Sequence, residues 1–334
     1  MFEPKSVLIT GGCGFIGSNF LNYIFNKWPN SIIVNFDKLA EGSFKENVTS
    51  EIRSSNRYSI VVGNLLNKEQ IFKTLFLYKI DTIVHFAALT HVDDSYADRI
   101  GTIYENVMST TNLLEAVIEY GGIQRFLYIS TDEVYGDSEE NEEQKNERAP
   151  LNPTNPYAAS KAAAENIIRC YYHSYKLPYV MVRMNNVFGP NQYETKLIPK
   201  FIKLAFYGQP YTLRSDGSHT RNWIFVDDCA EAIKRTIESG RIGEIYNIGS
   251  EYEYSNFEVM CFIHKYVAGY LGRKPGPIKL RQIQDRPYHD RRYYIDFSKI
   301  AKEFGWKCKT SFEEGLLKTI DHTLKNMKKE KFNE

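Results

Sequence analysis

The fold of this chain is decided by residues 7–17, which read Val7-Leu8-Ile9-Thr10-Gly11-Gly12-Cys13-Gly14-Phe15-Ile16-Gly17. The first three residues are apolar and favour a strand. Three glycines, Gly11, Gly14 and Gly17, then recur at every third position and open a helical pattern. The order predicts a buried strand, a tight turn and a helix. Such a turn lets a diphosphate approach the backbone N–H groups at the helix N-terminus.

A carboxylate closes the next predicted strand. Asp37 lies 20 residues after Gly17, where an acidic residue accepts hydrogen bonds from an adenosine ribose. The glycines and Asp37 together predict an NAD site, because this carboxylate also repels the 2′-phosphate of NADP. Lys38 could tolerate that phosphate, but the adjacent carboxylate outweighs it. The alternative is an ordinary strand–helix turn with a capping glycine.

The wider pattern alternates short apolar runs with helical stretches, which is typical of a parallel sheet covered by helices. We expect strands at residues 6–10, 32–37, 58–62, 82–86, 125–130 and 179–183. We expect helices at 17–27, 69–78, 104–120 and from 157 to about 175. The predicted fold class is α/β, a Rossmann-type doubly wound parallel sheet. Residues 1–184 should form mainly the NAD-binding domain, and residues 185–330 mainly a smaller substrate-binding part interleaved with late strands.

Composition argues against several classes of partner. The 334 residues carry 42 Lys and Arg against 41 Asp and Glu, so no overall field favours nucleic acid or an anionic membrane. No run approaches the roughly 20 apolar residues of a membrane span. An apolar strand from Val7 leaves no room for a signal peptide. Five dispersed cysteines without C-x-x-C spacing argue for a cytoplasmic location and against a metal site.

Two further motifs indicate acid–base chemistry. Tyr157 and Lys161 share one face of a predicted helix, where the ammonium and an oxidised nicotinamide would lower the pKa of the tyrosine. Asp132 and Glu133 follow the fifth predicted strand, at the edge where open α/β sheets bind ligands. Either pair alone is common in ordinary helices and loops. Together they suggest oxidation of a hydroxyl followed by elimination.

The combination resembles the extended branch of the short-chain dehydrogenase/reductase superfamily, since Tyr157 follows Gly17 by 140 residues. Thr131-Asp132-Glu133 before Val-Tyr-Gly is similar to the signature of nucleoside-diphosphate-glucose 4,6-dehydratases, such as the dTDP-glucose enzyme of rhamnose synthesis. Four later segments resemble that family in the same order. Residues 183–190 are similar to its R-x-S-N-N-Y-G-P, 196–199 to K-L-I-P, 221–223 to R-D-W and 285–290 to D-R-P-G-H-D.

The resemblance implies a set of site residues. The catalytic ones would be Thr131, Asp132, Glu133, Tyr157 and Lys161. NAD would be held by Gly11, Gly14, Phe15, Ile16, Gly17, Asp37, Lys38, Asn64, Leu65, Phe86, Ala87, Ala88, Thr90, Tyr157 and Lys161. A nucleotide sugar would be held by Thr90, Thr131, Asn186, Lys196, Leu197, Arg221, Asn256, Arg286 and His289. Two of these, Arg221 and Arg286, suit a diphosphate because guanidinium forks match its oxygens.

The resemblance also implies a reaction. Tyr157 takes the C4 hydroxyl proton while hydride passes from C4 to NAD, and Thr131 hydrogen-bonds the same hydroxyl. Glu133 then removes the C5 proton and Asp132 protonates the departing C6 hydroxyl. Hydride then returns to C6 and C5 is reprotonated, which gives a 4-keto-6-deoxy sugar. The family further implies a homodimer built on the helices at 104–120 and 157–175.

Departures from the family pattern concern nucleotide preference. Asn64 replaces an aspartate beside the adenine, Val187 an asparagine, Asn222 an aspartate and Tyr288 a glycine. The bulk and hydroxyl of Tyr288, next to His289, favour a uridine over a thymidine nucleotide. The sequence leaves the choice between dTDP- and UDP-glucose open.

Two other functions share part of this pattern. A nucleotide-sugar epimerase or glucuronate decarboxylase of the same superfamily has the glycine turn and the Tyr/Lys pair. Epimerases need no acid pair after the threonine, so Asp132 and Glu133 argue against them. A non-catalytic NAD-binding regulator often lacks the equivalents of Tyr157 or Lys161, and both are present here.

Overall fold

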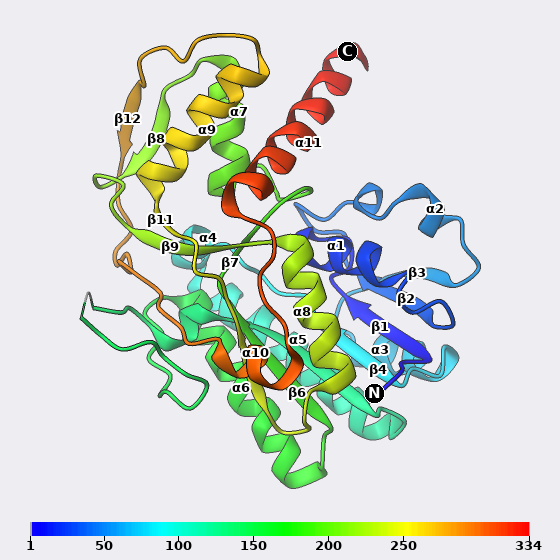
Figure 1. Cartoon of the computed structure of the whole chain (residues 1–334). Helices are drawn as coiled ribbons and strands as arrows, with labels where there is room; N and C mark the ends of the chain where they lie inside the picture. The colour runs from blue at the N-terminus through cyan, green and yellow to red at the C-terminus, as the bar shows by residue number, and fades with distance from the viewer. Residues whose placement is uncertain (1, 140, 334) are drawn as a thin grey trace.

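A seven-stranded parallel sheet forms the centre of the structure, a computed structural model that describes residues 2–139 and 141–333 (Figure 1). The strand order is β3-β2-β1-β4-β5-β6-β10. The strands are β1 Ser6–Thr10, β2 Ile32–Asp37, β3 Tyr58–Val62, β4 Thr82–His85, β5 Arg125–Thr131, β6 Tyr179–Met184 and β10 Ile245–Ile248. The order reverses between β1 and β4, the switch point of a doubly wound sheet. The predicted Rossmann-type fold is confirmed.

Helices cover both faces of this sheet. Val7 and Ile9 of β1 belong to the same core as α1 (Phe15–Ile24) and α8 (Val226–Ser239). Leu8, between them, belongs to the opposite core with α3 (Lys68–Leu77), α5 (Arg99–Tyr120) and α6 (Pro156–Tyr175). A strand that is covered on both faces has a continuous run of apolar residues instead of an alternating pattern. This explains why the sequence of β1 is apolar from Val7 to Ile9.

The later part of the chain adds two small sheets, drawn in the upper half of Figure 1, and more helices. One sheet joins β7 (Asn186–Phe188), β9 (Thr220–Phe225) and β11 (Glu253–Ser255), and the other β8 (Tyr211–Arg214) and β12 (Leu280–Ile283). The helices are α7 (Leu197–Tyr207), α9 (Asn256–Tyr270), α10 (Ser298–Phe304) and α11 (Phe312–Asn333). Between them the chain returns to the first layer through α8 and β10. None of the helices in the described ranges is long and apolar enough to cross a membrane.

The six predicted strands are all present, with ends that differ by at most one residue, but two helices begin two or more residues earlier than the sequence indicates. The helix expected at 17–27 runs Phe15–Ile24 because Gly14 takes the N-cap position. The helix expected at 104–120 begins at Arg99 because the Asp98 side chain accepts a hydrogen bond from Gly101 N at 2.8 Å. A side-chain cap of this kind satisfies one of the free N–H groups of the first turn and fixes the start of the helix.

Candidate active site

The predicted site residues lie at the carboxyl edge of the parallel sheet. β1 ends before the glycine turn, β5 ends at Thr131 before the short helix η2 (Asp132–Tyr135), and β6 ends at Met184. α6 carries Tyr157 and Lys161 and packs against β5 and η2. Because the carboxyl ends of parallel strands meet at one edge, residues far apart in the sequence become neighbours there.

The glycine turn has the shape that a dinucleotide diphosphate requires. Gly11 has φ +71°, and a Cβ on it would lie 2.8 Å from Ala87 N. A Cβ on Gly17 would lie 2.3 Å from the Gly11 carbonyl oxygen. Gly14 begins α1 without a side-chain cap, and Phe15 and Ile16 form its first turn. The turn therefore leaves the N-terminus of α1 accessible to a diphosphate, and these residues fit NAD.

The Asp37 carboxylate is buried beside this turn. Its Oδ2 accepts a hydrogen bond from Cys13 N at 2.9 Å, and its Oδ1 accepts one from Leu39 N at 2.8 Å. Ser43 Oγ donates to both oxygens at 3.0 Å. Lys38 forms an ion pair with Glu105 of α5. The positive charge that could have tolerated a 2′-phosphate is therefore already paired.

The other segments predicted to hold NAD lie on both sides of the glycine turn. Leu65 is buried just after β3, and exposed Asn64 uses its Oδ1 to accept a hydrogen bond from Leu66 N at 2.9 Å. On the other side, Phe86 follows β4 and packs against Phe20 with ring centroids 5.4 Å apart. The half-buried Ala87 and Ala88 come next, and then exposed Thr90.

The two adjacent carboxyls have different surroundings. Asp132 is only 2% exposed, and burial, reinforced by the charge of Glu133, raises its pKa to about 7. Thr131 Oγ1 donates to Asp132 Oδ1 at 3.2 Å. Glu133 is half-buried and accepts a hydrogen bond from Asn155 Nδ2 at 3.0 Å. One carboxyl of the pair can therefore hold a proton near neutral pH, as a general acid must.

Tyr157 and Lys161 are buried on the face of α6 that meets β5. The Lys161 Nζ lies 4.2 Å from the centre of the Tyr128 ring, and burial lowers the pKa of this lysine to about 7. Burial, Glu133 and Asp132 raise the pKa of Tyr157. This direction is opposite to the one that the Tyr/Lys spacing predicts. The protein groups alone do not favour a phenolate, because burial disfavours the charged form and the charges of Glu133 and Asp132 add to this effect.

Positively charged side chains approach the site from the later part of the chain. Lys196, before α7, donates through Nζ to the carbonyl oxygen of Thr90 at 2.9 Å. Arg286 donates through Nε to Asp93 Oδ1 at 2.7 Å, and Arg214 donates to Asp93 Oδ2 at 3.1 Å. The structure thus brings Lys196 and Arg286 to the predicted substrate side, together with an aspartate and an arginine that the sequence did not single out.

Arg221 is arranged differently from the diphosphate ligand that the sequence predicts. It is 7% exposed, and its guanidinium lies 4.4 Å from the centre of the Tyr293 ring. Its N–H groups donate to the backbone carbonyls of Thr220, Asp290 and Arg291 at 2.6, 3.0 and 3.2 Å. In this arrangement Arg221 holds the segment around residue 290 in place.

The remaining substrate candidates sit at element starts. Asn186 begins β7, Leu197 begins α7 and Asn256 begins α9. The His289 ring stacks on His219 with centroids 3.6 Å apart and an interplanar angle of 11°.

His219, His289 and Asp285 place possible metal-binding atoms within 4.8 Å of one another. The lone pairs of stacked rings lie in two nearly parallel planes, so the two histidines do not converge on one point as ligands of a metal ion do. The arrangement is that of a ring stack, with the His289 Nδ1 at 2.9 Å from Asp285 Oδ1.

Tyr288 does not lie as the sequence suggests. Its side chain is half exposed, and its hydroxyl donates to Asp137 Oδ2 at 3.4 Å. The hydroxyl is therefore directed at the loop after η2, and a contact of Tyr288 with the nucleotide stays a prediction.

Sequence reasoning missed several residues that contact the site. Asn185 donates to Asp132, Asn155 and Tyr293 donate to Glu133, and Asp93 accepts from Arg286. Asn155 had a detectable signal, since an asparagine just before a proline-initiated helix is a typical N-cap, and its Oδ1 accepts from Ala158 N at 2.8 Å. No local sequence pattern marks Asp93, because its partners Arg214 and Arg286 lie more than a hundred positions away.

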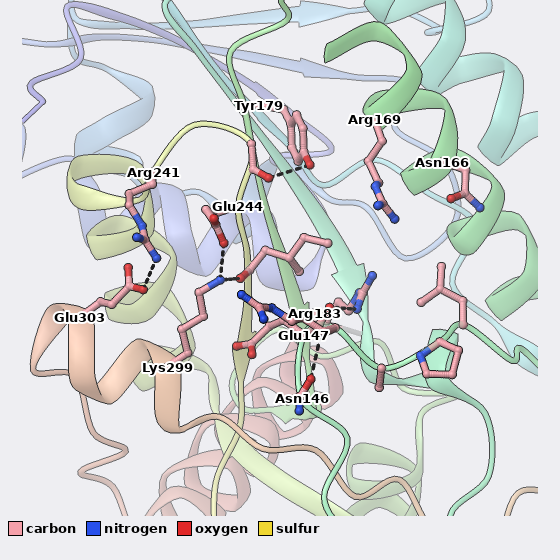
Figure 2. Close-up of a pocket in the computed structure, with 16 residues that line it drawn as sticks. Asn146, Glu147, Asn166, Arg169, Tyr179, Arg183, Arg241, Glu244, Lys299 and Glu303 are labelled. Carbon is pink, nitrogen blue, oxygen red and sulfur yellow. Dashed lines mark hydrogen bonds and ion pairs between the residues drawn. The ribbon is translucent and has the colours of Figure 1, made fainter. Parts of the chain in front are cut away.

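A cavity of about 970 Å³ lies elsewhere (Figure 2). Ion pairs between Arg241 and Glu303 and between Lys299 and Glu244 cross one side of it, and Arg169 extends into it from α6. Its lining contains none of the predicted catalytic, NAD-binding or substrate-binding residues. Cavity size therefore does not locate the site, and the converging side chains do.

Comparisons with known proteins agree with this geometry. The family model described as GDP-mannose 4,6 dehydratase matches residues 8–319. The chain is 36% identical to the dTDP-glucose 4,6-dehydratase of Neisseria gonorrhoeae over 96% of each chain. It is 40% identical, over 97% of its length, to a trifunctional UDP-glucose 4,6-dehydratase, epimerase and reductase of Arabidopsis thaliana. The chain spans only 48% of that plant protein.

Solved structures show the same fold. The dTDP-glucose 4,6-dehydratase DesIV from Streptomyces venezuelae, solved with NAD bound, superposes with a TM-score of 0.89 at 33% identity, covering 97% of this chain and 98% of that one. The UDP-glucose 4-epimerase of Thermus thermophilus, in complex with NAD, has a TM-score of 0.85 at 29% identity. The match covers 96% of this chain and 99% of the epimerase chain. The resemblance seen in the motifs is confirmed: the chain belongs to the GDP-mannose 4,6-dehydratase family.

Proposed function

We propose that the chain is an NAD-dependent nucleoside-diphosphate-glucose 4,6-dehydratase, which forms the 4-keto-6-deoxy sugar used in rhamnose-type deoxysugar biosynthesis. The observation that carries this proposal is the carboxyl pair at the end of β5. Burial raises the pKa of Asp132 to about 7, while the neighbouring Glu133 is half-buried and held by Asn155. An acid and a base therefore stand side by side, next to a buried tyrosine.

NAD, when bound, accepts a hydride from C4 of the sugar and supplies it again to C6. The residues of the chain move the protons. Tyr157 accepts the proton of the C4 hydroxyl, and Thr131 hydrogen-bonds that hydroxyl. Burial and the two carboxyls raise the pKa of Tyr157. Lys161, one turn further along α6, favours the phenolate when it is protonated, as does the positive charge of the oxidised nicotinamide.

Elimination uses the carboxyl pair. A ketone at C4 acidifies the hydrogen at C5, which Glu133 removes as general base. Asp132 donates its proton to the departing C6 hydroxyl, which leaves as water. When the hydride returns to C6, Glu133 gives its proton back to C5, which completes the 4-keto-6-deoxy sugar. A pKa of about 7 suits this role, because an effective general acid is still protonated at the working pH but releases its proton readily.

The same geometry weighs against the rival functions. The Thermus epimerase shares the fold, so overall shape does not separate epimerase from dehydratase. The buried acid next to a second carboxyl separates them, since epimerisation at C4 requires no acid for a leaving hydroxyl. A non-catalytic NAD-binding protein has no need for the buried Tyr157 and Lys161.

The substrate is UDP-glucose or dTDP-glucose, and we propose that UDP-glucose is turned over at least as well. Support comes from the relatives, because identity is 40% to a plant protein named for UDP-glucose and 36–37% to several proteins named for dTDP-glucose. The two nucleotides differ by one methyl group and one hydroxyl. A pocket that contacts one methyl group discriminates between two substrates by only roughly 1–3 kcal/mol.

We also propose a homodimer in the cytoplasm. α5 packs against α6. On α5 the exposed fractions of Ile100, Ile103 and Tyr104 are 84%, 42% and 56%. Exposed apolar side chains on one helix favour a partner helix from a second copy. On α6, the small residues Ala158, Ala162 and Ala164 are buried within the chain itself and are not available to a partner. All five cysteines are free thiols, which favours a reducing compartment.

Incubation of the purified protein with NAD and either UDP-glucose or dTDP-glucose tests the function. We expect the NDP-4-keto-6-deoxy-glucose product, identified by NMR, with no net NADH. Formation of the galactose nucleotide instead would identify an epimerase. A kcat/KM for dTDP-glucose more than tenfold above that for UDP-glucose would reject the nucleotide proposal, and light scattering at 38.8 kDa, the mass of one chain, would reject the dimer.

A further inference from the structure

A buried asparagine holds the acid of the proposed mechanism. Asn185 lies directly after β6, and its Nδ2 donates to Asp132 Oδ2 at 2.8 Å. Asn185 is 4% exposed and Asp132 2% exposed, so water does not replace this contact. The backbone N–H of Asn185 donates to Ile248 O at 3.0 Å, which fixes the asparagine between the ends of β6 and β10.

The orientation of the Asn185 amide is determined by a second contact. Asn185 Oδ1 lies 3.3 Å from the backbone nitrogen of Ser250. A backbone N–H can only donate, so the amide group that faces it must be the oxygen. The Nδ2 group is therefore the one that faces Asp132. Gly249 makes room for this arrangement, because a Cβ there would lie 2.4 Å from Asn185 Oδ1.

This geometry assigns the proton of the acid to one oxygen. Only one hydrogen fits between Asn185 Nδ2 and Asp132 Oδ2 at 2.8 Å, and the amide supplies it. The other oxygen, Oδ1, lies 3.2 Å from Thr131 Oγ1. A hydroxyl can accept as well as donate, so the Thr131 contact leaves room for a proton on Oδ1 when Asp132 is protonated, whereas the amide contact leaves none on Oδ2. We propose that Asn185 is a positioning residue that keeps Oδ2 of Asp132 as an acceptor and so places the acid proton on Oδ1, the oxygen beside Thr131. The catalytic meaning of this inference rests on the proposed dehydration, whereas the proton position itself does not.

Charged and titratable groups on three elements face Asp132. Burial makes the largest contribution and raises its pKa, and Glu133 on η2 raises it further. The charge of Arg221 on β9 lowers the pKa of Asp132. The Asp132 carboxylate in turn raises the pKa of Tyr157 on α6. The Asn185 hydrogen bond also lowers the pKa, because a donor to the carboxylate stabilises its charged form. Removal of this donor alone should therefore raise the pKa of Asp132.

The test is a titration of the Asp132 carboxyl in the full chain. Protein labelled with ¹³C at the aspartate carboxyl carbons is followed by NMR from pH 5 to pH 9, and Asp132→Asn assigns the resonance. We expect a midpoint near the value of about 7 in the wild type. In Asn185→Ala the midpoint should rise by about one pH unit. The high-pH limb of kcat for dehydration should move in the same direction.

A second variant and a control make the result decisive. Asn185→Asp keeps the shape and the contact with Ser250 but replaces the donor by an acceptor, so it should also raise the midpoint. Asn222→Ala removes another buried asparagine that bonds to Ser250, through Nδ2 to its carbonyl oxygen at 2.9 Å, without touching Asp132, and should leave the midpoint unchanged. An unchanged midpoint in both Asn185 variants overturns the inference. An inactive wild type would reject the proposed function but would leave the titration valid.

Discussion

Asp93, the second residue of the short helix α4 (Val92–Ala97), accepts a hydrogen bond from Arg286 Nε at 2.7 Å across 193 positions of sequence. The carboxylate also accepts one from Arg214. Burial raises the pKa of Asp93, but the two guanidiniums outweigh it and hold the pKa below its usual range. An ionised Asp93 thus fixes the direction of an arginine that we expect at the substrate's diphosphate.

Replacement of Asp93 should weaken substrate binding more than chemistry. In Asp93→Asn the charge-assisted bond to Arg286 is lost, so we expect KM for the nucleotide sugar to rise about tenfold with a much smaller change in kcat. Steady-state kinetics measure both. The matched control is Asp94→Asn on the same helix turn, whose carboxylate makes no ion pair with Arg286, and it should leave KM near the wild-type value.

Oxidation and elimination should be separable by mutation. Glu133→Gln should retain NAD binding and oxidation at C4 but stop before water loss, so absorbance of NADH at 340 nm should accumulate in a single turnover. Tyr157→Phe should abolish that absorbance change, because no group then accepts the hydroxyl proton. Normal product formation by both variants would show that the assigned roles are wrong.

NAD should be bound in preference to NADP. Asp37 is buried beside the glycine turn, and Lys38 is paired with Glu105, so a 2′-phosphate would meet an uncompensated carboxylate. We expect calorimetric titration to show at least about tenfold weaker binding of NADP. Asp37→Asn should narrow the difference, whereas equal affinities in the wild type would contradict the assignment.

The stability of the fold should fall as the pH is lowered from about 6.5. His85 lies 1% exposed between Thr10 and Thr110, and burial lowers its pKa from 6.5 to about 3. The folded state keeps this ring neutral, while the unfolded state binds a proton below pH 6.5. His85 therefore contributes stability that is fully present above pH 6.5 and is lost as the pH falls toward 3, at about 1.4 kcal/mol per pH unit.

Denaturant unfolding between pH 7 and pH 5 checks this prediction. The loss of unfolding free energy per pH unit should be smaller in His85→Gln than in the wild type, whatever the absolute stability of the variant. His173→Gln changes an exposed histidine on α6 and should leave the slope as it is. Parallel slopes for the wild type and His85→Gln would show that His85 is not the group responsible.

The sequence was most informative where a signal is local. The glycine turn, the apolar runs of β1 to β6 and the i, i+4 spacing of Tyr157 and Lys161 each depend on neighbouring residues, and the structure places them as expected. The later part of the chain was harder to predict. Its strands are short and its sheets join segments far apart, such as β8 with β12, so no local period marked them.

Arg221 and Tyr288 show why residue roles need the tertiary structure. An arginine in a familiar motif can bind a ligand and can also brace the backbone. The three carbonyls around Arg221 show that it braces the backbone, and its contact with a diphosphate stays a prediction. Tyr288 stands beside His289 in the sequence, yet its hydroxyl meets Asp137, 151 positions away.

The sequence by itself determined the parallel sheet, the diphosphate-binding turn and the presence of two adjacent carboxyls. These follow from spacing along the chain, which is fixed before the chain folds. Only the tertiary structure decided the protonation of that pair. Asp132 is buried and bonded to Asn185, 53 positions away, while Glu133 is half-buried and bonded to Asn155. The physical reason is that the pKa of a carboxyl depends on the solvent and the donors around it, and folding, not sequence proximity, supplies both.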